Sequence, residues 1–349
     1  SAMKVADLRF DYPEELIATK PMRPSRVLCV EDGISEISFQ QLLEKIPAGD
    51  ILVLNNTKVL KRRIFTDQFE IVFLKQKSER QWEVLFPSRK LQVGSQILLP
   101  ENTVMTILEK GRPQIVELNH TVDEAYFERV AELPLPPYIQ KIRNERVPLV
   151  DDQSWYQTSW AKSPGSLAAP TASLHFNAED IGYLKKRGVR VCELTLHVGL
   201  GTFLPVLTED LDDHLMHKEV VEISARTWNE VISAKKAWQE VWAMGTTVAR
   251  ALESVAIGKI KASADGHYTG ETDLKIQPGF EWKVVSRLLT NFHQPESTLL
   301  ALVAAFIDLE TVKKAYTYAI EKKMRLFSYG DLSVWVRKIG NEKSSNDEW

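Results

Sequence analysis

Five short runs of alternating apolar and polar residues follow one another between Thr66 and Asn119, with no helical periodicity between them. Such alternation is typical of strands with one buried face, because successive side chains of a strand point to opposite sides. The runs lie close together and are bounded by Gly, Pro, Ser or Asn, as in a small barrel. They occupy residues 69–74, 82–86, 95–99, 104–108 and 114–118. We therefore predict an inserted small antiparallel β-barrel-like domain over residues 66–119.

On both sides of this insert the chain alternates strands with helices. The expected strands are 26–30, 51–54, 189–196 and 241–244, and the expected helices are 39–46, 123–132, 177–188, 224–238 and 245–255. Asn177 is a good N-cap and Gly188 a good C-terminal glycine for one of these helices. The pattern predicts an α/β main domain with a mixed α+β sheet, discontinuous over 3–65 and 120–338, followed by a flexible tail at 339–349.

Composition limits the class of protein without naming an activity. With 349 residues, 44% of them hydrophobic and 26% charged, the chain can form an ample core and two domains. The net charge of −3 argues against a protein that coats nucleic acid non-specifically. Cys29 and Cys192 lie in apolar runs and are expected to be buried thiols in a reducing compartment. No signal pattern and no apolar run of membrane-spanning length is present, so we expect a cytoplasmic protein without membrane contact.

Four separated runs combine small, hydroxylated and ring-nitrogen residues, as expected where backbone approaches a ligand. They are 55–57, 163–176, 195–203 and 290–297. The second contains Thr171 and His175 and leads into a predicted helix. Thr195 and His197 share one face of a strand, and the glycines that follow allow a close backbone approach.

Three histidines lie in these runs, and a neutral imidazole is well suited to accept a proton near pH 7. They are His175, His197 and His293, each of which also fits a purely structural, hydrogen-bonded role. His214 and His217 have a spacing that could bind a metal, but neither a His-Glu-x-x-His core nor a cysteine partner accompanies them, so no metal is expected. A polar helix or loop at the pocket lip is expected there instead, with Glu219 offering a carboxylate.

Gly245-Thr246-Thr247 joins a predicted strand to a predicted helix. This arrangement points free backbone N–H groups at an anion, although a plain strand-to-helix turn fits equally well. The complete glycine fingerprint of dinucleotide-binding proteins is absent from the sequence.

Many long motifs, in one order from about Met3 to Val336, resemble the S-adenosylmethionine:tRNA ribosyltransferase-isomerase family of queuosine biosynthesis. They include 52–59 with Arg63, 134–139, 156–158, 164–165 through 172, 174–176, 195–199, 201–203, 213–219, 245–254, 278–280, 290–293, 295–299 and 327–331. The sequence departs from the family pattern at Ser173, where glycine is usual, at Met324, where an aromatic residue is usual, and in a shorter insert.

The resemblance implies transfer of the ribosyl part of S-adenosylmethionine to 7-aminomethyl-7-deazaguanine in a tRNA anticodon, with isomerisation and release of adenine and methionine. S-adenosylmethionine is then a consumed co-substrate, with no other cofactor, and we expect a monomer. One base begins the reaction, and His175 or His197 fits this role. A second titratable group is expected among His293, Glu219 and Asp331. Glu219 with Phe203 or Phe292 is expected near the sulfonium.

The residues expected to bind substrate are Asn55, Asn56, Thr57, Arg63, Thr171, Thr195, Gly199, Gly201, Thr202, Phe203, His217, Gly245, Thr246, Thr247, Arg250, Asn291, Phe292, Ser297 and Tyr329. The three-residue run at Gly245 is expected to hold the methionine carboxylate. Lys58, Lys61 and Arg62 are the expected tRNA contacts, with 185–190 or the β insert as alternatives. The competing functions are a non-catalytic RNA-binding protein and a conventional S-adenosylmethionine-dependent methyltransferase.

Overall fold

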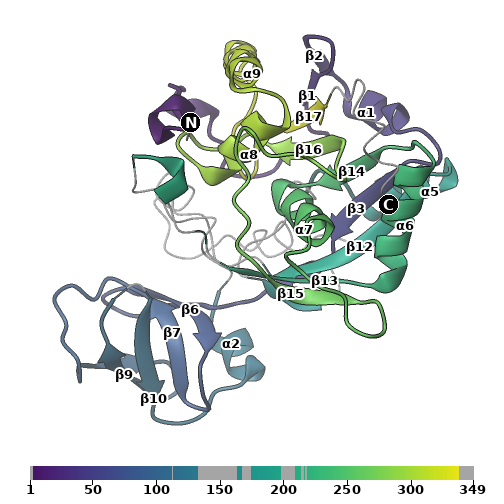
Figure 1. Ribbon diagram of the computed structural model, residues 1–349. Helices are drawn as coiled ribbons and strands as arrows, with labels where there is room; N and C mark the ends of the chain where they lie inside the picture. Colours follow the sequence, from purple (N-terminus) through teal and green to yellow (C-terminus); the bar gives the residue numbers. More distant parts are fainter. Residues whose placement is uncertain are drawn as a thin grey trace.

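The computed structural model describes residues 3–111, 113–132, 163–166, 174–197, 209–213, 216 and 218–337. Their secondary structure forms two main units, a large mixed sheet covered by helices and a smaller antiparallel sheet that lies to one side of it (Figure 1). The mixed sheet and the curled β insert agree with the fold class expected from the sequence.

The large sheet has nine strands in the order β15-β13-β12-β3-β14-β16-β17-β1-β2. They are β1 (Val27–Val30), β2 (Ile34–Ile37), β3 (Ile51–Asn55), β12 (Arg190–His197), β13 (Glu219–Ile223), β14 (Val241–Met244), β15 (Tyr268–Thr272), β16 (Arg287–Asn291) and β17 (Leu332–Val336). The central neighbours β12, β3, β14 and β16 are parallel, whereas β13, β15, β17 and β2 introduce antiparallel pairs. The expected strands near 26–30, 51–54, 189–196 and 241–244 are confirmed.

Helices cover both faces of this sheet because its central strands are apolar on both sides. One face packs on α1 (Phe39–Lys45) and α5 (Ala178–Lys186), and the other packs on α6 (Ala225–Lys236), α7 (Thr246–Ala256), α8 (Thr298–Phe306) and α9 (Leu309–Glu321). The alternation is visible in single strands. Leu52, Leu54, Trp242 and Met244 lie in the first core, and Ile51, Val53, Val241 and Ala243 lie in the second.

Local capping fixes where several of these helices begin. The side chains of Ser38, Asn177, Ser224, Ser297 and Asp308 each accept a hydrogen bond from a backbone N–H in the first turn of their helix. Asn177 is thus the N-cap expected from the sequence. Ser297, expected to bind substrate, instead caps α8 and donates to the carbonyl of Gln294 at 2.8 Å.

The second sheet has six antiparallel strands in the order β5-β6-β7-β10-β9-β8. They are β5 (Arg63–Phe65), β6 (Glu70–Gln76), β7 (Gln81–Leu85), β8 (Gln96–Leu99), β9 (Thr103–Glu109) and β10 (Gln114–Leu118). Tyr126 and Phe127 of α2 (Glu124–Val130) belong to its hydrophobic core, as does Ile64. The packed unit therefore includes residues outside the range 66–119, since α2 covers the insert's core.

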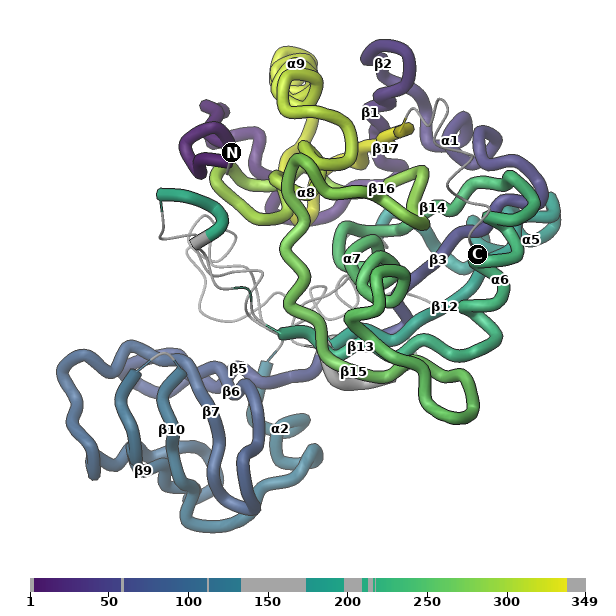
Figure 2. The backbone as a smooth tube through the Cα atoms, viewed as in Figure 1, coloured from purple at the N-terminus to yellow at the C-terminus, as the bar shows by residue number. Residues whose placement is uncertain are grey.

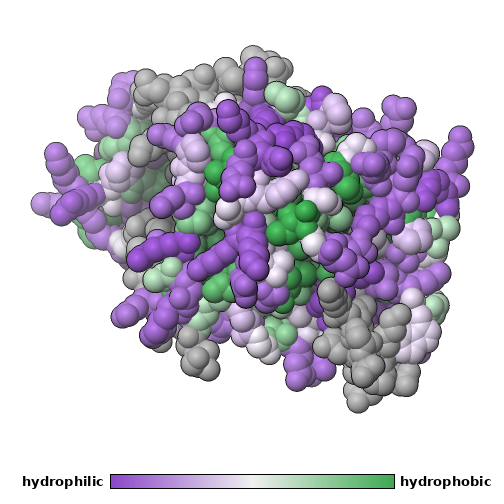
Figure 3. All heavy atoms as spheres, turned by 90° about the horizontal axis from the view of Figure 1, so that it is seen from above, coloured by the Kyte–Doolittle hydropathy of each residue, from purple (hydrophilic) through white to green (hydrophobic). Residues whose placement is uncertain are grey.

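Shorter elements complete the described chain. They are η1 (Val5–Leu8), η2 (Glu14–Leu16), η5 (Leu211–Asp213) and the two-stranded pair of β4 (Thr57–Val59) with β11 (Ser163–Ser166). Within the described residues, no helix has the length and apolarity needed to cross a membrane. The face seen from above is largely hydrophilic, with apolar side chains in small areas (Figure 3).

Candidate active site

The ends of several strands meet at one edge of the large sheet. Because β3, β12, β14 and β16 are parallel, their carboxyl ends at Asn55, His197, Met244 and Asn291 point the same way. Leu332, at the start of β17, pairs with Asn291, which brings the beginning of β17 to this edge as well. Ligands of open α/β sheets bind outside the carboxyl ends of the strands. Most of the described residues expected in the site lie along this edge.

His175 is buried at this edge between two polar side chains. Its Nδ1 contacts Oγ of Ser25, and its Nε2 lies 3.1 Å from Oδ1 of Asn291. The amide nitrogen of Asn291 donates to the carbonyls of Phe327 at 2.8 Å and Ser328 at 3.2 Å, so Oδ1 is the atom left to accept from the ring. We therefore assign the proton of neutral His175 to Nε2, which leaves Nδ1 to accept from the Ser25 hydroxyl.

Asp331 and Asn291 hold the backbone around this histidine. The Asp331 carboxylate accepts from the backbone N–H of Arg26 at 3.0 Å and of Arg325 at 2.8 Å. Burial raises the pKa of Asp331. Asp331 and Asn291 are 3% and 2% exposed. Their described hydrogen bonds are all made with other groups of the protein. Their geometry therefore fits positioning of His175 and its loops better than direct contact with substrate.

The surroundings of His175 favour its neutral form. Burial is the main cause that lowers the pKa of His175 from 6.5 to about 4, and the positive charges of Arg23 and Arg325 lower it further. Its hydrogen bond to Asn291 acts in the opposite direction without offsetting the burial. The imidazole is thus neutral, and able to accept a proton, throughout the physiological pH range.

This low pKa predicts a loss of stability in acid. Between pH 6.5 and about 4 the unfolded chain binds a proton at His175 and the folded chain does not, so the free energy of unfolding falls as pH falls. A shift of that size corresponds to about 3 kcal/mol. Denaturant unfolding at pH 7 and at pH 4 measures the loss. The variant His175→Gln should lose about 3 kcal/mol less than the native chain over this interval, and an equal loss in both proteins would contradict the assignment.

His293 and Phe292 face the interior of the main domain. The Nε2 of His293 lies 2.9 Å from Oγ1 of Thr290, and its backbone N–H donates to the hydroxyl of Tyr316 at 2.7 Å. Burial lowers the pKa of His293 to about 3. Phe292 is 1% exposed in the core with its ring against Tyr316, and Tyr329 is 2% exposed. The expected contacts of Phe292 and Tyr329 with substrate do not fit this burial.

Asn55 and Thr57 fasten β3 to β12. Oδ1 of Asn55 accepts from both the backbone N–H and the hydroxyl of Thr57 and from the N–H of Leu196, while its amide nitrogen donates to the Leu196 carbonyl. Both side chains are at most 1% exposed. Their role is structural, in contrast to the substrate contacts expected from the sequence. They fix the path of the chain as it leaves the sheet.

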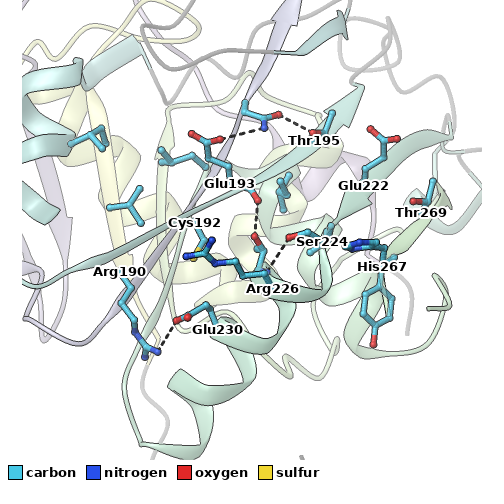
Figure 4. A pocket seen from close by; sticks show the side chains of 18 of the residues that line it. Arg190, Cys192, Glu193, Thr195, Glu222, Ser224, Arg226, Glu230, His267 and Thr269 are labelled. Carbon is cyan, nitrogen blue, oxygen red and sulfur yellow. Dashed lines mark hydrogen bonds and ion pairs between the residues drawn. The ribbon is translucent and has the colours of Figure 1, made fainter. Parts of the chain in front are cut away.

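Asn56 and Thr195 lie instead in an open groove of about 1230 Å³ beside β12 (Figure 4). The Thr195 hydroxyl donates to Oδ1 of Asn56 at 2.8 Å, and the Asn56 amide contacts Glu193 at 3.4 Å. Farther along the groove, Arg190 forms an ion pair with Glu230 at 3.1 Å. Both residues were expected to bind substrate, and both line this open groove.

Glu219 and Arg250 form a buried ion pair between the start of β13 and α7. Burial raises the pKa of Glu219, and the charge of Arg250 opposes this effect. The second carboxylate oxygen of Glu219, Oε2, is buried and has no hydrogen-bond partner within the described part of the chain. A buried acceptor without a donor is costly, so this oxygen is suited to receive a donor from a ligand.

Gly245 begins α7 with φ 108°, a conformation that favours glycine. No side chain caps this helix, so the N–H groups of its first turn at Thr246 and Thr247 point out of the carboxyl edge. The expected strand-turn-helix arrangement is present, and it can hold an anion.

His197 ends β12 with a side chain that is 27% exposed and an Nε2 3.8 Å from the Glu222 carboxylate. It is more accessible than His175, which is buried. A partly exposed imidazole beside a carboxylate can exchange protons with a ligand at this edge.

The basic residues at the start of the insert are occupied by acidic partners. Arg63 is fully buried, with Glu70 at 3.5 Å and Glu132 at 3.9 Å. The guanidinium of Arg62 pairs with Glu124 and stacks on Phe127 at 4.3 Å, and Nζ of Lys61 lies 3.2 Å from Glu128. These contacts contradict a substrate-binding role for Arg63 and a tRNA-binding role for Arg62, and they weaken that role for Lys61. The pairs of Lys61 and Arg62 instead join the segment before β5 to α2.

Several expected site residues lie outside the described residues. They are Thr171, Gly199, Gly201, Thr202, Phe203 and His217, together with Ser173, His214 and the side chain of Lys58. Within the described part of the chain, no group of three or more histidine, cysteine, aspartate or glutamate side chains could hold a metal ion.

Ser25 was not predicted from the sequence, although it contacts His175 directly. It precedes β1, and its position at the carboxyl edge depends on the pairing of Val27 with Leu332 on a strand that lies at the far end of the chain. The only local signal is a hydroxyl placed immediately before a buried strand. Such a signal does not reveal at which edge of the sheet the residue lies.

This chain, an α/β protein with a β insert, matches the family model described as queuosine biosynthesis protein over residues 5–334, and it belongs to that family. It is 40% identical to the S-adenosylmethionine:tRNA ribosyltransferase-isomerase of Halothermothrix orenii, covering 94% of this chain and 98% of that protein. It is 41% identical to the protein of the same name from Carboxydothermus hydrogenoformans, with 96% and 100% covered. The crystal structure of S-adenosylmethionine tRNA ribosyltransferase from Thermotoga maritima is 28% identical with a TM-score of 0.53, covering 94% and 99%.

Proposed function

We propose that this chain transfers the ribosyl part of S-adenosylmethionine to 7-aminomethyl-7-deazaguanine in tRNA and isomerises it, giving epoxyqueuosine-tRNA with release of adenine and methionine. The observation that carries the proposal is the similarity to curated proteins named for this activity, which extends over 94% or more of the chain. S-adenosylmethionine is consumed as a co-substrate, and we propose no other cofactor. The sulfonium itself supplies the electrophilic activation.

The sulfonium acidifies the hydrogens on the adjacent 5′ carbon, so a base of modest strength can begin the reaction. His175 is our first candidate because it is neutral and has Nδ1 as an acceptor. In the structure the Ser25 hydroxyl donates a hydrogen bond to Nδ1 of His175. A proton from the substrate therefore reaches the ring through Ser25, or directly once the Ser25 side chain has rotated away. His197, the last residue of β12, is the alternative base.

The other roles follow the charges along the carboxyl edge. The N–H groups at Thr246 and Thr247 suit the methionine carboxylate, because a helix N-terminus attracts an anion. Oε2 of Glu219 suits a cationic or hydrogen-donating group, such as the sulfonium or the methionine amino group. His293 and Asp331 are less suited to proton transfer with substrate, since their described contacts are internal.

Product analysis distinguishes this function from its competitors. The protein is incubated with S-adenosylmethionine and tRNA that carries 7-aminomethyl-7-deazaguanine, and the small molecules are quantified. Equal amounts of adenine and methionine are the expected products. S-adenosylhomocysteine would indicate a methyltransferase, and retention of tRNA without turnover would indicate an RNA-binding protein.

A further inference from the structure

Two arginines beside His175 are held in place by backbone carbonyls. Arg23 donates to the carbonyl of His175 at 3.2 Å and to that of Leu174 at 2.5 Å, and Arg325 donates to the carbonyl of Lys20. The segments that carry them run side by side, because Ile17 bridges to Leu326 in parallel (Figure 2). Both guanidiniums therefore lie at the same side of the site as Ser25 and His175.

The loop that carries Arg325 is tightly folded. A Cβ added to Gly330 would lie 2.3 Å from the Arg325 carbonyl oxygen, so only glycine fits there. Asp331 then accepts from the backbone N–H of Arg325, and Phe327 adopts φ 72°, which is rare for a bulky residue. The side-chain amide of Asn291 donates a hydrogen bond to the backbone carbonyl of Phe327 and so holds this strained residue. The loop therefore fixes the point from which the Arg325 side chain projects.

Neither nearby carboxylate forms a hydrogen bond with the guanidinium of Arg23 or Arg325 among the described residues. Asp180 lies 3.7 Å from Arg23, but it also caps α5, and both oxygens of Asp331 accept from backbone N–H groups. Burial lowers the pKa of Arg23 and Arg325 more than these carboxylates raise it. Lys20, on the same segment, is exposed and forms no ion pair among the described residues.

We propose that Lys20, Arg23 and Arg325 bind a backbone phosphate of the tRNA, next to the nucleotide that is modified. The proposal rests on the proposed function for the identity of the RNA. A guanidinium suits a phosphate because its N–H groups can donate in pairs to two oxygens. The side chain of Arg23 is 43% exposed, as contact with a macromolecule from solvent requires. These residues replace Lys61 and Arg62 as the proposed tRNA contacts, because Lys61 and Arg62 are paired with acidic side chains.

The methionine carboxylate is another anion that these arginines could bind, and the two ligands predict different variant phenotypes. Loss of a phosphate contact lowers the affinity for RNA. It also makes that affinity less dependent on salt, since each phosphate contact releases counterions. Loss of a carboxylate contact raises the Michaelis constant for S-adenosylmethionine at saturating RNA. The experiment below measures both quantities in the same proteins.

The variants Lys20→Gln and Arg325→Gln test the proposal. Binding of an anticodon stem-loop RNA is measured over a series of salt concentrations. Because the three side chains share one phosphate, each variant should reduce the slope of log K against log salt by at most about 0.7, the value for one phosphate contact of a single strand. The Michaelis constant for S-adenosylmethionine should stay unchanged. Arg325→Lys, which keeps the charge, should retain most of the slope.

Arg287→Gln is the matched control, because Arg287 is also a partly buried arginine but lies at the opposite end of β16 with Glu240 at 3.4 Å. Its slope should equal that of the native chain. Unchanged slopes in both test variants, equal losses in the control, or a selective rise in the Michaelis constant for S-adenosylmethionine would overturn the proposal. Adenine release by the native protein tests the proposed function separately, since RNA can bind here whether or not it is modified.

Discussion

Replacing His175 by alanine should lower the rate of adenine release by about 10²–10⁴-fold, the usual effect of losing a general base. The reason is geometric as well as electrostatic, since neutral His175 has its Nε2 proton directed at Asn291 and its Nδ1 directed at Ser25. Single-turnover assays at saturating S-adenosylmethionine measure the chemical step, and filter binding measures tRNA affinity, which should change little.

The control for this variant is His120→Ala, because His120 contacts Thr103 in the β insert, away from the carboxyl edge of the main sheet. It should keep native turnover. Near-native turnover in folded His175→Ala would contradict the assignment and make His197 the candidate for the same test. A rise in the Michaelis constant alone would assign His175 to substrate positioning.

Replacing Glu219 by alanine should lower the free energy of unfolding by about 3–5 kcal/mol, because it leaves the Arg250 charge buried without its partner. Arg250 is 4% exposed, and its described ion pair is with Glu219. Denaturant unfolding monitored by tryptophan fluorescence measures the loss. The loss should exceed that caused by removing an exposed ion pair, such as the pair of Lys314 and Glu310. Exposed pairs contribute at most about 1 kcal/mol to stability.

The double variant Glu219→Met with Arg250→Met separates pairing from packing. Removing both charges leaves no uncompensated ion, so it should recover most of the stability lost in the single variant. If the double variant is as unstable as Glu219→Ala, packing around the pair accounts for the loss. A single variant of native stability would contradict the buried ion pair itself.

The sequence predicts the elements of the fold well where the apolar pattern is strong and local. The strands near 51–54 and 241–244 are apolar throughout, as expected for strands covered on both faces. It does not predict β13, where Glu219 and Glu222 interrupt a short apolar run. That strand depends on backbone pairing with β15, about fifty positions away, which local periodicity does not reveal.

The sequence identifies the polar segments of the site better than the role of each residue. Parallel pairing brings His197 and Asn291 to one edge, but strand order decides this, and strand order is a long-range property. Arg62 looks like a free cation in the sequence, whereas its partner Glu124 is far away in the chain. Thr57 is likewise polar and close to the site, yet its side chain is hydrogen-bonded to Asn55 and to the backbone N–H of Leu196 in β12.

In the proposed reaction the ribose of S-adenosylmethionine is transferred whole to the tRNA. S-adenosylmethionine labelled with carbon-13 in every ribose carbon tests it directly, with the tRNA digested and its nucleosides weighed by mass spectrometry. We expect a modified nucleoside that carries the complete labelled ribose, together with unlabelled adenine and methionine. A nucleoside that carries no ribose label, or that gains only the methyl group, would contradict it.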